Sequence, residues 1–174
     1  MAALFAALTG VGSLIAVPLS PVPITLQTLF VYLAGTVLGS HRGALSQALY
    51  LILGSVGLPI FAGGGVGFGT LIGPTGGYLI GFIVSAFVIG KLVEVKKNQN
   101  FTWILLSISI GTLIIYLLGM AQLSLWLRMT LFDAFCIGVL PFLIADALKI
   151  LLAALITVKV YNVLGPLDAR RVPK

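Results

Sequence analysis

Two charged side chains lie inside the last apolar stretch of the sequence, GVLPFLIADALKILLAALI (residues 138–156). Asp146 and Lys149 are three residues apart, so a helix places them on one face, about one turn from each other. The carboxylate accepts hydrogen bonds, and the ammonium group donates them and carries charge. Together they suit a small ligand that offers N–H donors beside a carbonyl or carboxylate. The alternative is a mutual salt bridge that only fixes helices, although apolar packing often stabilises as well as a buried ion pair does.

A glycine-rich segment supplies a second candidate contact surface. Eleven of the 21 glycines lie between Gly54 and Gly81, around the stretch GLPIFAGGGVGFGTLIGPTGGY. This stretch contains neither GxxxxGK[ST] nor GxGxxG, which argues against a nucleotide-binding loop. Bare glycine backbone can approach a ligand closely, and Phe61, Phe68 and Tyr78 would add apolar walls. The alternative is a flexible connection, or helix packing through small residues.

Two segments near the N-terminus carry weaker signals. The proline-rich stretch SPVPITLQT (residues 20–28) predicts a stiff lid over a cavity, with Thr25 and Gln27 offering polar contacts. A tight interhelical turn is the other interpretation of this stretch. The first helix has alanines in small-xxx-small spacing, which lets another helix approach closely, from a partner or from the same bundle. These alanines are Ala2, Ala3, Ala6 and Ala7.

The composition determines the environment of these residues. The 174-residue chain is 60% hydrophobic and 8% charged, with a mean hydropathy of +1.20, whereas soluble domains carry roughly 25% charged residues. We therefore expect an all-α integral membrane protein with a single domain over residues 1–174. One cysteine, one histidine and four acidic residues argue against a disulfide or a metal site. No catalytic residue and no cofactor are assigned.

Six apolar segments are long enough, or nearly so, to cross a hydrocarbon core of roughly 30 Å, and in lipid they must be helices. Six spans place both termini on one side of the membrane. The basic residues in the turns and at the span ends fall almost entirely on that side, so the positive-inside rule places both termini in the cytoplasm. The segments cover residues 2–17, 26–40, 43–58, 76–93, 102–120 and 136–162. The basic residues expected in the cytoplasm are Arg42, Lys91, Lys96, Lys97, Lys159, Arg170, Arg171 and Lys174, with Arg128 on the other side.

These basic anchors account for the formal net charge of +6 without a nucleic acid partner. The first apolar segment lacks the basic n-region of a signal peptide, so we expect it to be retained as a span. Because it is short, we expect a few further residues upstream. The outer connections then cover residues 18–25, 59–75 and 121–135.

Three of these stretches together resemble the biotin-specific S component (BioY family) of energy-coupling factor (ECF) transporters. They are SPVPITLQTLFVYLAG, GLPIFAGGGVGFGTLIGPTGGYLIGF and GVLPFLIADALK, in the family's order. The resemblance implies a six-helix protein of the cytoplasmic membrane of a prokaryote, which captures biotin in a cavity near the extracellular face. It also implies partners, namely a transmembrane T component and two cytoplasmic ATPase subunits, and ATP is hydrolysed only by those subunits.

The resemblance assigns roles to individual residues. The family's Asp-x-x-Lys falls on Asp146 and Lys149, which would bind the polar groups of biotin. Two loops would cover the ligand, one over residues 61–78 and one over residues 21–27. Their candidate contacts are Phe61, Gly63, Phe68, Thr75 and Tyr78 in the first loop, and Thr25 and Gln27 in the second.

The small-residue face of the first helix, at Ala2, Ala3, Ala6 and Ala7, would dock onto the T component. Two features depart from the family pattern. Ala145 stands where the family often has glycine before the aspartate, and the first helix begins abruptly at Met1.

Three classes of function compete. High-affinity biotin capture and uptake as an S component accounts for all three stretches, and an S component for another vitamin is its nearest variant. An intramembrane enzyme using Asp146 and Lys149 as acid and base would need further polar groups, and the spans offer little beyond scattered hydroxyls. A channel would need polar rings or stripes along a pore. A self-sufficient small-molecule carrier would differ from an S component in its energy source.

Overall fold

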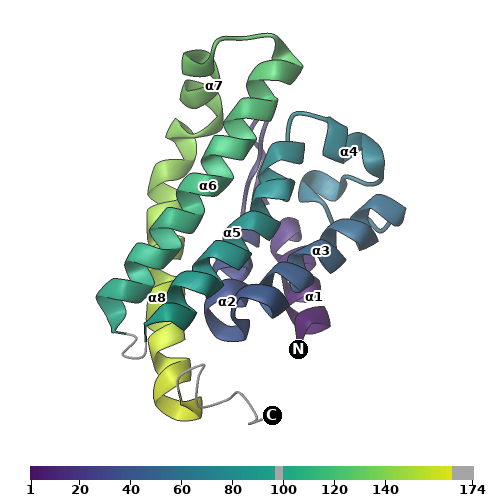
Figure 1. Cartoon of the computed structure of the whole chain (residues 1–174). Coiled ribbons are helices and arrows are strands. Elements are labelled where there is room, and N and C mark those ends of the chain that lie inside the picture. The colour runs from purple at the N-terminus through teal and green to yellow at the C-terminus, as the bar shows by residue number, and fades with distance from the viewer. Residues whose placement is uncertain (97–99, 166–174) are drawn as a thin grey trace.

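The computed structural model describes residues 1–96 and 100–165, and most of these residues are helical (Figure 1). Predictions that rest on Lys97, Arg170, Arg171 and Lys174 lie outside the described residues. The predominantly helical character expected from the sequence is confirmed. The long helices are α1 (Ala2–Leu14), α2 (Gln27–Leu38), α3 (Ser40–Val56), α5 (Gly76–Val95), α6 (Phe101–Leu127) and α8 (Leu143–Leu164).

Short elements join these helices. They are β1 (Ala16–Val17), β2 (Ile24–Thr25), η1 (Ala62–Gly64), α4 (Phe68–Ile72), α7 (Leu131–Gly138) and η2 (Leu140–Phe142). The two strands pair antiparallel, with Ala16 opposite Thr25 and Val17 opposite Ile24. The proline-rich connection therefore closes as a small hairpin, which an all-helical prediction did not include.

The break between α6 and α7 has local causes. Helix α6 ends at Arg128, which adopts a left-handed conformation with φ 52°. Thr130 then caps α7, because its Oγ1 accepts from the Asp133 N–H at 3.1 Å. The predicted fifth span stopped at residue 120, whereas α6 continues to Leu127. The predicted outer connection, residues 121–135, contains this break, but α6 and α7 extend further into it than predicted.

Helix α5 packs chiefly against α6, and also against α2 and α3. Small residues permit the α5–α6 contact, since a Cβ added to Gly77 would lie 2.2 Å from the Leu118 carbonyl oxygen. A second close junction separates α2 from α3 at Gly39, where φ is 83°. The Ser40 N–H and hydroxyl both donate to the Glu94 carboxylate of α5, at 2.8 and 2.9 Å. This contact ties the α2–α3 junction to α5.

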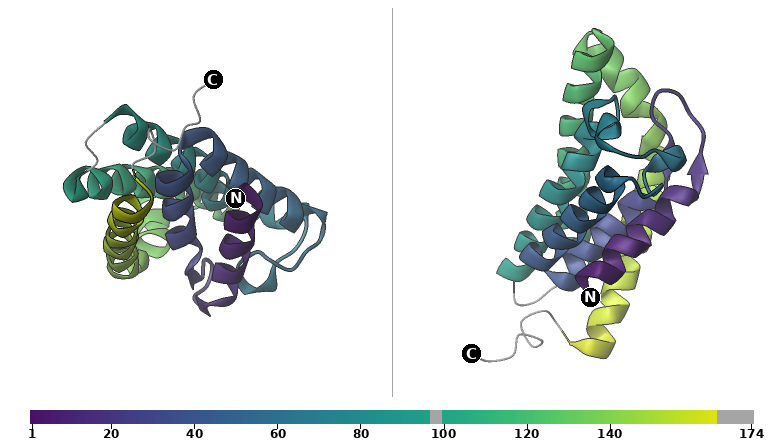
Figure 2. Two further views of the ribbon diagram at one scale, coloured as in Figure 1. Left: turned by 90° about the horizontal axis from the view of Figure 1, so that it is seen from below. Right: turned by 90° about the vertical axis from the view of Figure 1, so that its right-hand side faces the viewer.

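The long helices run between two ends of the molecule (Figures 1 and 2). The N-terminus, the α2–α3 junction and the end of α8 lie at one end, called here the terminal end. The hairpin and α7 lie toward the other, called here the loop end. The start of α3, which contains Arg42, and the ends of α5 and α8, which contain Lys91 and Lys159, lie at the terminal end, with Lys96 directly after α5. The end of α6, which precedes Arg128, lies at the loop end.

Three helical segments of the described chain are long and apolar enough to cross a membrane. They are Gly76–Val95, Phe101–Leu127 and Leu131–Val163, the last of which includes α7, η2 and α8. Helices α1 and α2 are apolar but shorter. Large apolar side chains also face outward, with Leu125 81% exposed and Ile144 80% exposed. Such surfaces suit contact with lipid, which supports the predicted membrane location.

Candidate binding site

Asp146 and Lys149 lie near the start of α8 and are almost fully buried, with 3% and 7% of their surface exposed. Lys149 Nζ donates to Asp146 Oδ1 at 2.7 Å, which is a charge-assisted hydrogen bond across one helical turn. The start of α8 also favours a carboxylate, because the helix dipole is positive there. The two predicted residues therefore form a contact pair, and the mutual salt bridge is one of its interactions.

Two side chains from other helices form hydrogen bonds to this pair. The Tyr116 hydroxyl of α6 donates to Asp146 Oδ2 at 2.6 Å. Thr28 Oγ1 of α2 donates to Asp146 Oδ1 at 3.2 Å and accepts from Lys149 Nζ at 3.2 Å. Sequence reasoning missed both residues. The available signals were a lone tyrosine in the apolar run LIIYLLG and a hydroxyl directly after Gln27.

These four polar residues line one cavity, and the remaining wall is mainly apolar. The free space inside is about 50 Å³, far below the roughly 300–1,000 Å³ of typical small-molecule sites. A ligand larger than a few water molecules can therefore bind only if the covering segments move. The other lining residues are Val22, Pro23, Thr25, Gln27, Phe61, Ala62, Thr70, Thr75, Tyr78, Leu79, Phe82, Ile115 and Phe142.

Hydrogen bonds beside the cavity join the start of α2 to the segment that precedes η1. Gln27 Nε2 donates to the Tyr50 hydroxyl, which in turn donates to the Ile60 carbonyl oxygen at 3.0 Å. Phe61 is fully buried and meets the Tyr50 ring edge-on, with centroids 5.5 Å apart. Thr25 Oγ1 donates to Gln27 Oε1 at 2.9 Å. The structure thus brings Thr25, Gln27 and Phe61 to the cavity.

Tyr78 and Thr75 line the same cavity from the start of α5. The Tyr78 hydroxyl donates to the Gly138 carbonyl oxygen at 2.7 Å, which ties α5 to the end of α7. The Tyr78 ring packs against α6 at Gly119, where an added Cβ would lie 2.3 Å from the ring. Tyr78 is therefore fixed as a wall, and Thr75 adds a half-buried hydroxyl beside it.

The structure does not bring Phe68 and Gly63 to the cavity. Phe68 begins α4, is 68% exposed, and lies in an apolar groove against α3, with Leu51 and Ile52. Gly63 is exposed, and nothing lies within 4 Å of the position of a Cβ there. Its φ of 70° shows that glycine serves the turn of η1. In this structure Phe68 and Gly63 therefore lie outside the cavity lining, and their predicted contact with the ligand stays a prediction.

The four alanines predicted as a docking face do not share one face. Ala3 and Ala7 are exposed, and Ala2 is half-buried. Ala6 is 2% exposed and belongs to the core of the bundle. Ala6 therefore does not lie on the exposed side of α1 with Ala3 and Ala7.

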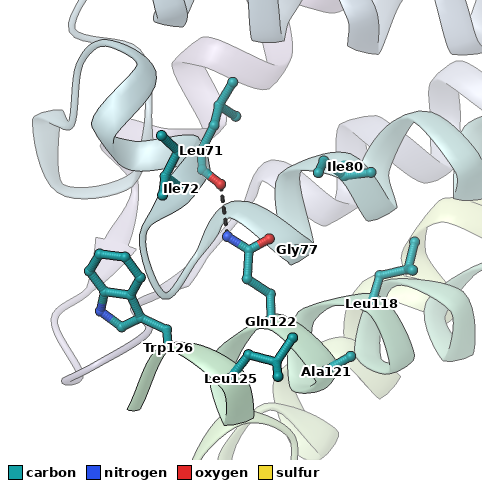
Figure 3. Close-up of a pocket in the computed structure, with 9 residues that line it drawn as sticks. All are labelled: Leu71, Ile72, Gly77, Ile80, Leu118, Ala121, Gln122, Leu125 and Trp126. Atoms are coloured by element: carbon teal, nitrogen blue, oxygen red, sulfur yellow. Dashed lines mark hydrogen bonds between the residues drawn. The ribbon is translucent and has the colours of Figure 1, made fainter. Parts of the chain in front are cut away.

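A second hollow lies between the α4–α5 turn and α6 (Figure 3). Its wall is apolar apart from Gln122, whose Nε2 donates to the carbonyl oxygens of Leu71 and Gly73, both at 2.7 Å. Trp126 and Leu125, which also line this hollow, are 51% and 81% exposed. Gln122 therefore fixes the α4–α5 turn, and the hollow lacks the charged pair that marks the first cavity.

Comparison with known proteins shows that this chain is similar to members of one protein family. The sequence model of the BioY family matches residues 1–166. The "Biotin transporter BioY" of Thermotoga maritima is 46% identical over 158 residues, which cover 91% of this chain and 92% of that protein. The "Probable biotin transporter BioY" of Pyrococcus horikoshii is 43% identical over 156 residues, covering 90% and 91%. The crystal structure of the S component for biotin from an ECF-type ABC transporter is similar, with a TM-score of 0.86 and 30% identity, covering 92% of this chain and 88% of that one.

Proposed function

This chain belongs to the BioY family, and we propose that it captures biotin and takes it up as the S component of an ECF-type transporter. The observation that carries the proposal is the cavity in which the Asp146–Lys149 pair faces apolar walls. The family is one of transport proteins, and no enzymatic step is assigned to the chain.

The chemistry of biotin suits this cavity. Its cyclic urea has N–H donors beside one carbonyl oxygen, so Asp146 would accept from an N–H and Lys149 would donate to the carbonyl oxygen. The remaining ring and the methylene groups of the tail are apolar and would pack against Phe61, Phe82 and Phe142. The carboxylate that ends the tail is a second acceptor of the kind to which Lys149 can donate. Burying polar groups is favourable only when they find partners, and here the charged pair supplies them.

Binding requires the cover to open, because the free space is only about 50 Å³. The segments that would move are the β1–β2 hairpin and the segment around Phe61. Thr25 of the hairpin bonds to Gln27, and Gln27 is linked through Tyr50 to Ile60 beside Phe61. Thr25, Gln27, Thr75 and Tyr78 would then contact the ligand as the cover closes again. The closed cover would keep the bound ligand away from water and lipid.

The proposed topology has six spans, with the terminal end in the cytoplasm. Arg42, Lys91, Lys96 and Lys159 at that end support this orientation under the positive-inside rule. The binding cavity would then open near the extracellular face of a prokaryotic cytoplasmic membrane. This placement suits capture of a vitamin from outside the cell.

The proposed partners are a transmembrane T component and two cytoplasmic ATPase subunits, which would supply the energy for uptake. The docking face would be the exposed side of α1, at Ala3 and Ala7 with Ala2 beside them. Leu4 and Val11 are also exposed on α1, by 54% and 52%. Small residues on an apolar face permit close approach of another helix within the membrane.

Titration of the purified protein in detergent, without ATP, tests the proposed substrate. The protein should bind biotin tightly at one site per chain, and it should not bind thiamin or riboflavin at the same concentrations. Binding of either of those vitamins without binding of biotin would overturn the assignment.

A further inference from the structure

We propose that Tyr116, which lines the cavity, is a positioning residue for biotin capture and acts through its hydrogen bond to Asp146. The inference rests on the proposed function, and it concerns a residue that the Asp-x-x-Lys motif does not include. Tyr116 lies on α6, while Asp146 lies on α8 and Thr28 on α2. The contact therefore depends on how three helices pack.

The acceptor positions of Asp146 can be counted. A carboxylate offers about four lone-pair positions, two on each oxygen. Oδ1 accepts from Lys149 at 2.7 Å and from Thr28 at 3.2 Å, so both of its positions are taken. Oδ2 accepts from Tyr116 at 2.6 Å. One acceptor position on Oδ2 is left for a ligand, and the Tyr116 hydroxyl determines which one.

The donor positions of Lys149 can be counted in the same way. An ammonium group has three N–H donors, and two of them point to Asp146 Oδ1 and Thr28 Oγ1. One donor is left for a ligand. The pair therefore presents one acceptor beside one donor, which matches an N–H next to a carbonyl oxygen. Without Tyr116, Oδ2 would offer two positions and the carboxylate could rotate, so this match would be less well defined.

Three of the other tyrosine hydroxyls donate to backbone carbonyl oxygens, and the fourth, that of Tyr32, accepts from Thr112 Oγ1 at 2.9 Å. The hydroxyls of Tyr50 and Tyr78 donate to backbone carbonyl oxygens of Ile60 and Gly138. The Tyr161 hydroxyl donates to the Thr36 carbonyl oxygen near the terminal end. Among the tyrosine hydrogen bonds described for the structure, only that of Tyr116 reaches the Asp146 carboxylate. Tyr161 therefore provides a matched control for removal of a tyrosine hydroxyl.

The test compares wild-type protein with Tyr116→Phe and Tyr161→Phe. Hydrogen bonds to charged groups are worth enough that Tyr116→Phe should lower biotin affinity roughly 10- to 100-fold. Tyr161→Phe should bind within about two-fold of wild type. Infrared difference spectra report on the mechanism, because the Asp146 carboxylate band, identified by its loss in Asp146→Asn, should shift in Tyr116→Phe and stay in place in Tyr161→Phe.

Each outcome decides a separate point. Unchanged biotin affinity in Tyr116→Phe overturns the inference, and so does a loss of affinity without a shift of the carboxylate band, which would mean that Tyr116 contacts the ligand directly. Wild-type protein that binds no biotin contradicts the proposed function instead. If Tyr116→Phe does not fold, a variant with 3-fluorotyrosine at position 116 keeps the hydroxyl as a stronger donor. That variant must shift the band in the opposite direction, and an unshifted band overturns the inference.

Discussion

Asp146 and Lys149 each keep other partners when one of them is replaced, and this separates their role in binding from their role in stability. After Lys149→Ala, Asp146 still accepts from Tyr116 and Thr28. After Asp146→Asn, Lys149 still donates to Thr28. We therefore expect both variants to fold, with a lower thermal stability than wild type because each leaves one buried charge uncompensated. Losing one partner of a buried charged hydrogen bond should weaken biotin binding by roughly 2–5 kcal/mol, about 30- to several-thousand-fold.

Calorimetric titration and thermal unfolding of both variants check this expectation. Lys159→Ala is the matched control, since Lys159 lies on the same helix but is exposed. It should bind biotin like wild type. Variants that unfold readily yet bind normally once folded would assign the pair a purely structural role.

Sequence analysis at this scale predicted the charged pair because Asp146 and Lys149 are close in the sequence and unusual in an apolar stretch. It did not predict Thr28, which is 118 positions away from Asp146, or Tyr116, which is 30 positions away. Their roles follow from the packing of three helices, which one sequence does not specify. Phe68 lies outside the cavity in this structure, at the start of α4 directly after Gly67, whose φ is 77°, and it is 68% exposed.

The cover of the cavity includes one close contact, between the backbone of α3 at Gly54 and the ring of Phe61. A Cβ added to Gly54 of α3 would lie 2.3 Å from the Phe61 ring, which is fully buried against Tyr50. Gly54→Ala should therefore push Phe61 out of the cavity wall. Overpacking of this kind costs roughly 1–3 kcal/mol, and biotin affinity should fall about 5- to 150-fold.

Gly69→Ala is the matched control for this prediction, since nothing lies within 4 Å of its added Cβ. It should leave biotin affinity unchanged. The measurement is the dissociation constant of biotin for the two variants, and equal affinities in both would show that Phe61 does not shape the site.

Two positions on α1 allow the effect of a substitution on partner docking to be distinguished from its effect on folding. Ala3 is exposed and Ala6 is buried, so a bulky side chain should act differently at the two positions. Ala3→Leu should leave biotin binding intact and impair uptake in cells that also produce the T component and the ATPases. Ala6→Leu should lower the free energy of unfolding by about 1–3 kcal/mol through overpacking. Full uptake by Ala3→Leu would contradict a docking role for this face.

Sequence analysis at the scale of elements located the long helices, because apolar runs bounded by glycine, proline and charge indicate spans. The ends were less well predicted where backbone geometry, rather than composition, stops a helix. Arg128 and Thr130 end α6 and begin α7 within an apolar, glycine-free stretch. The hairpin was hidden as well, since a pair of two-residue strands leaves no periodic pattern.

The orientation of the whole molecule in the membrane can be tested at the positions of two arginines. Arg42 lies near the start of α3 at the terminal end, Arg128 lies at the loop end, and both are exposed. In a Cys136→Ser background, an impermeant thiol reagent added to intact cells should label Arg128→Cys and not Arg42→Cys. Permeabilised cells should allow labelling of both. The reverse pattern in intact cells would place the terminal end outside the cell.

The central claim, that the Asp146–Lys149 cavity is the biotin site, is tested most directly by the double variant Asp146→Asn with Lys149→Met. This variant removes both charges together, so no uncompensated buried charge remains to unfold the protein. The measurement is its biotin affinity in detergent, at a thermal stability close to that of wild type. We predict a folded protein whose affinity is lower by at least about 100-fold. A folded double variant that binds biotin like wild type would contradict the account and leave the pair as a structural clamp.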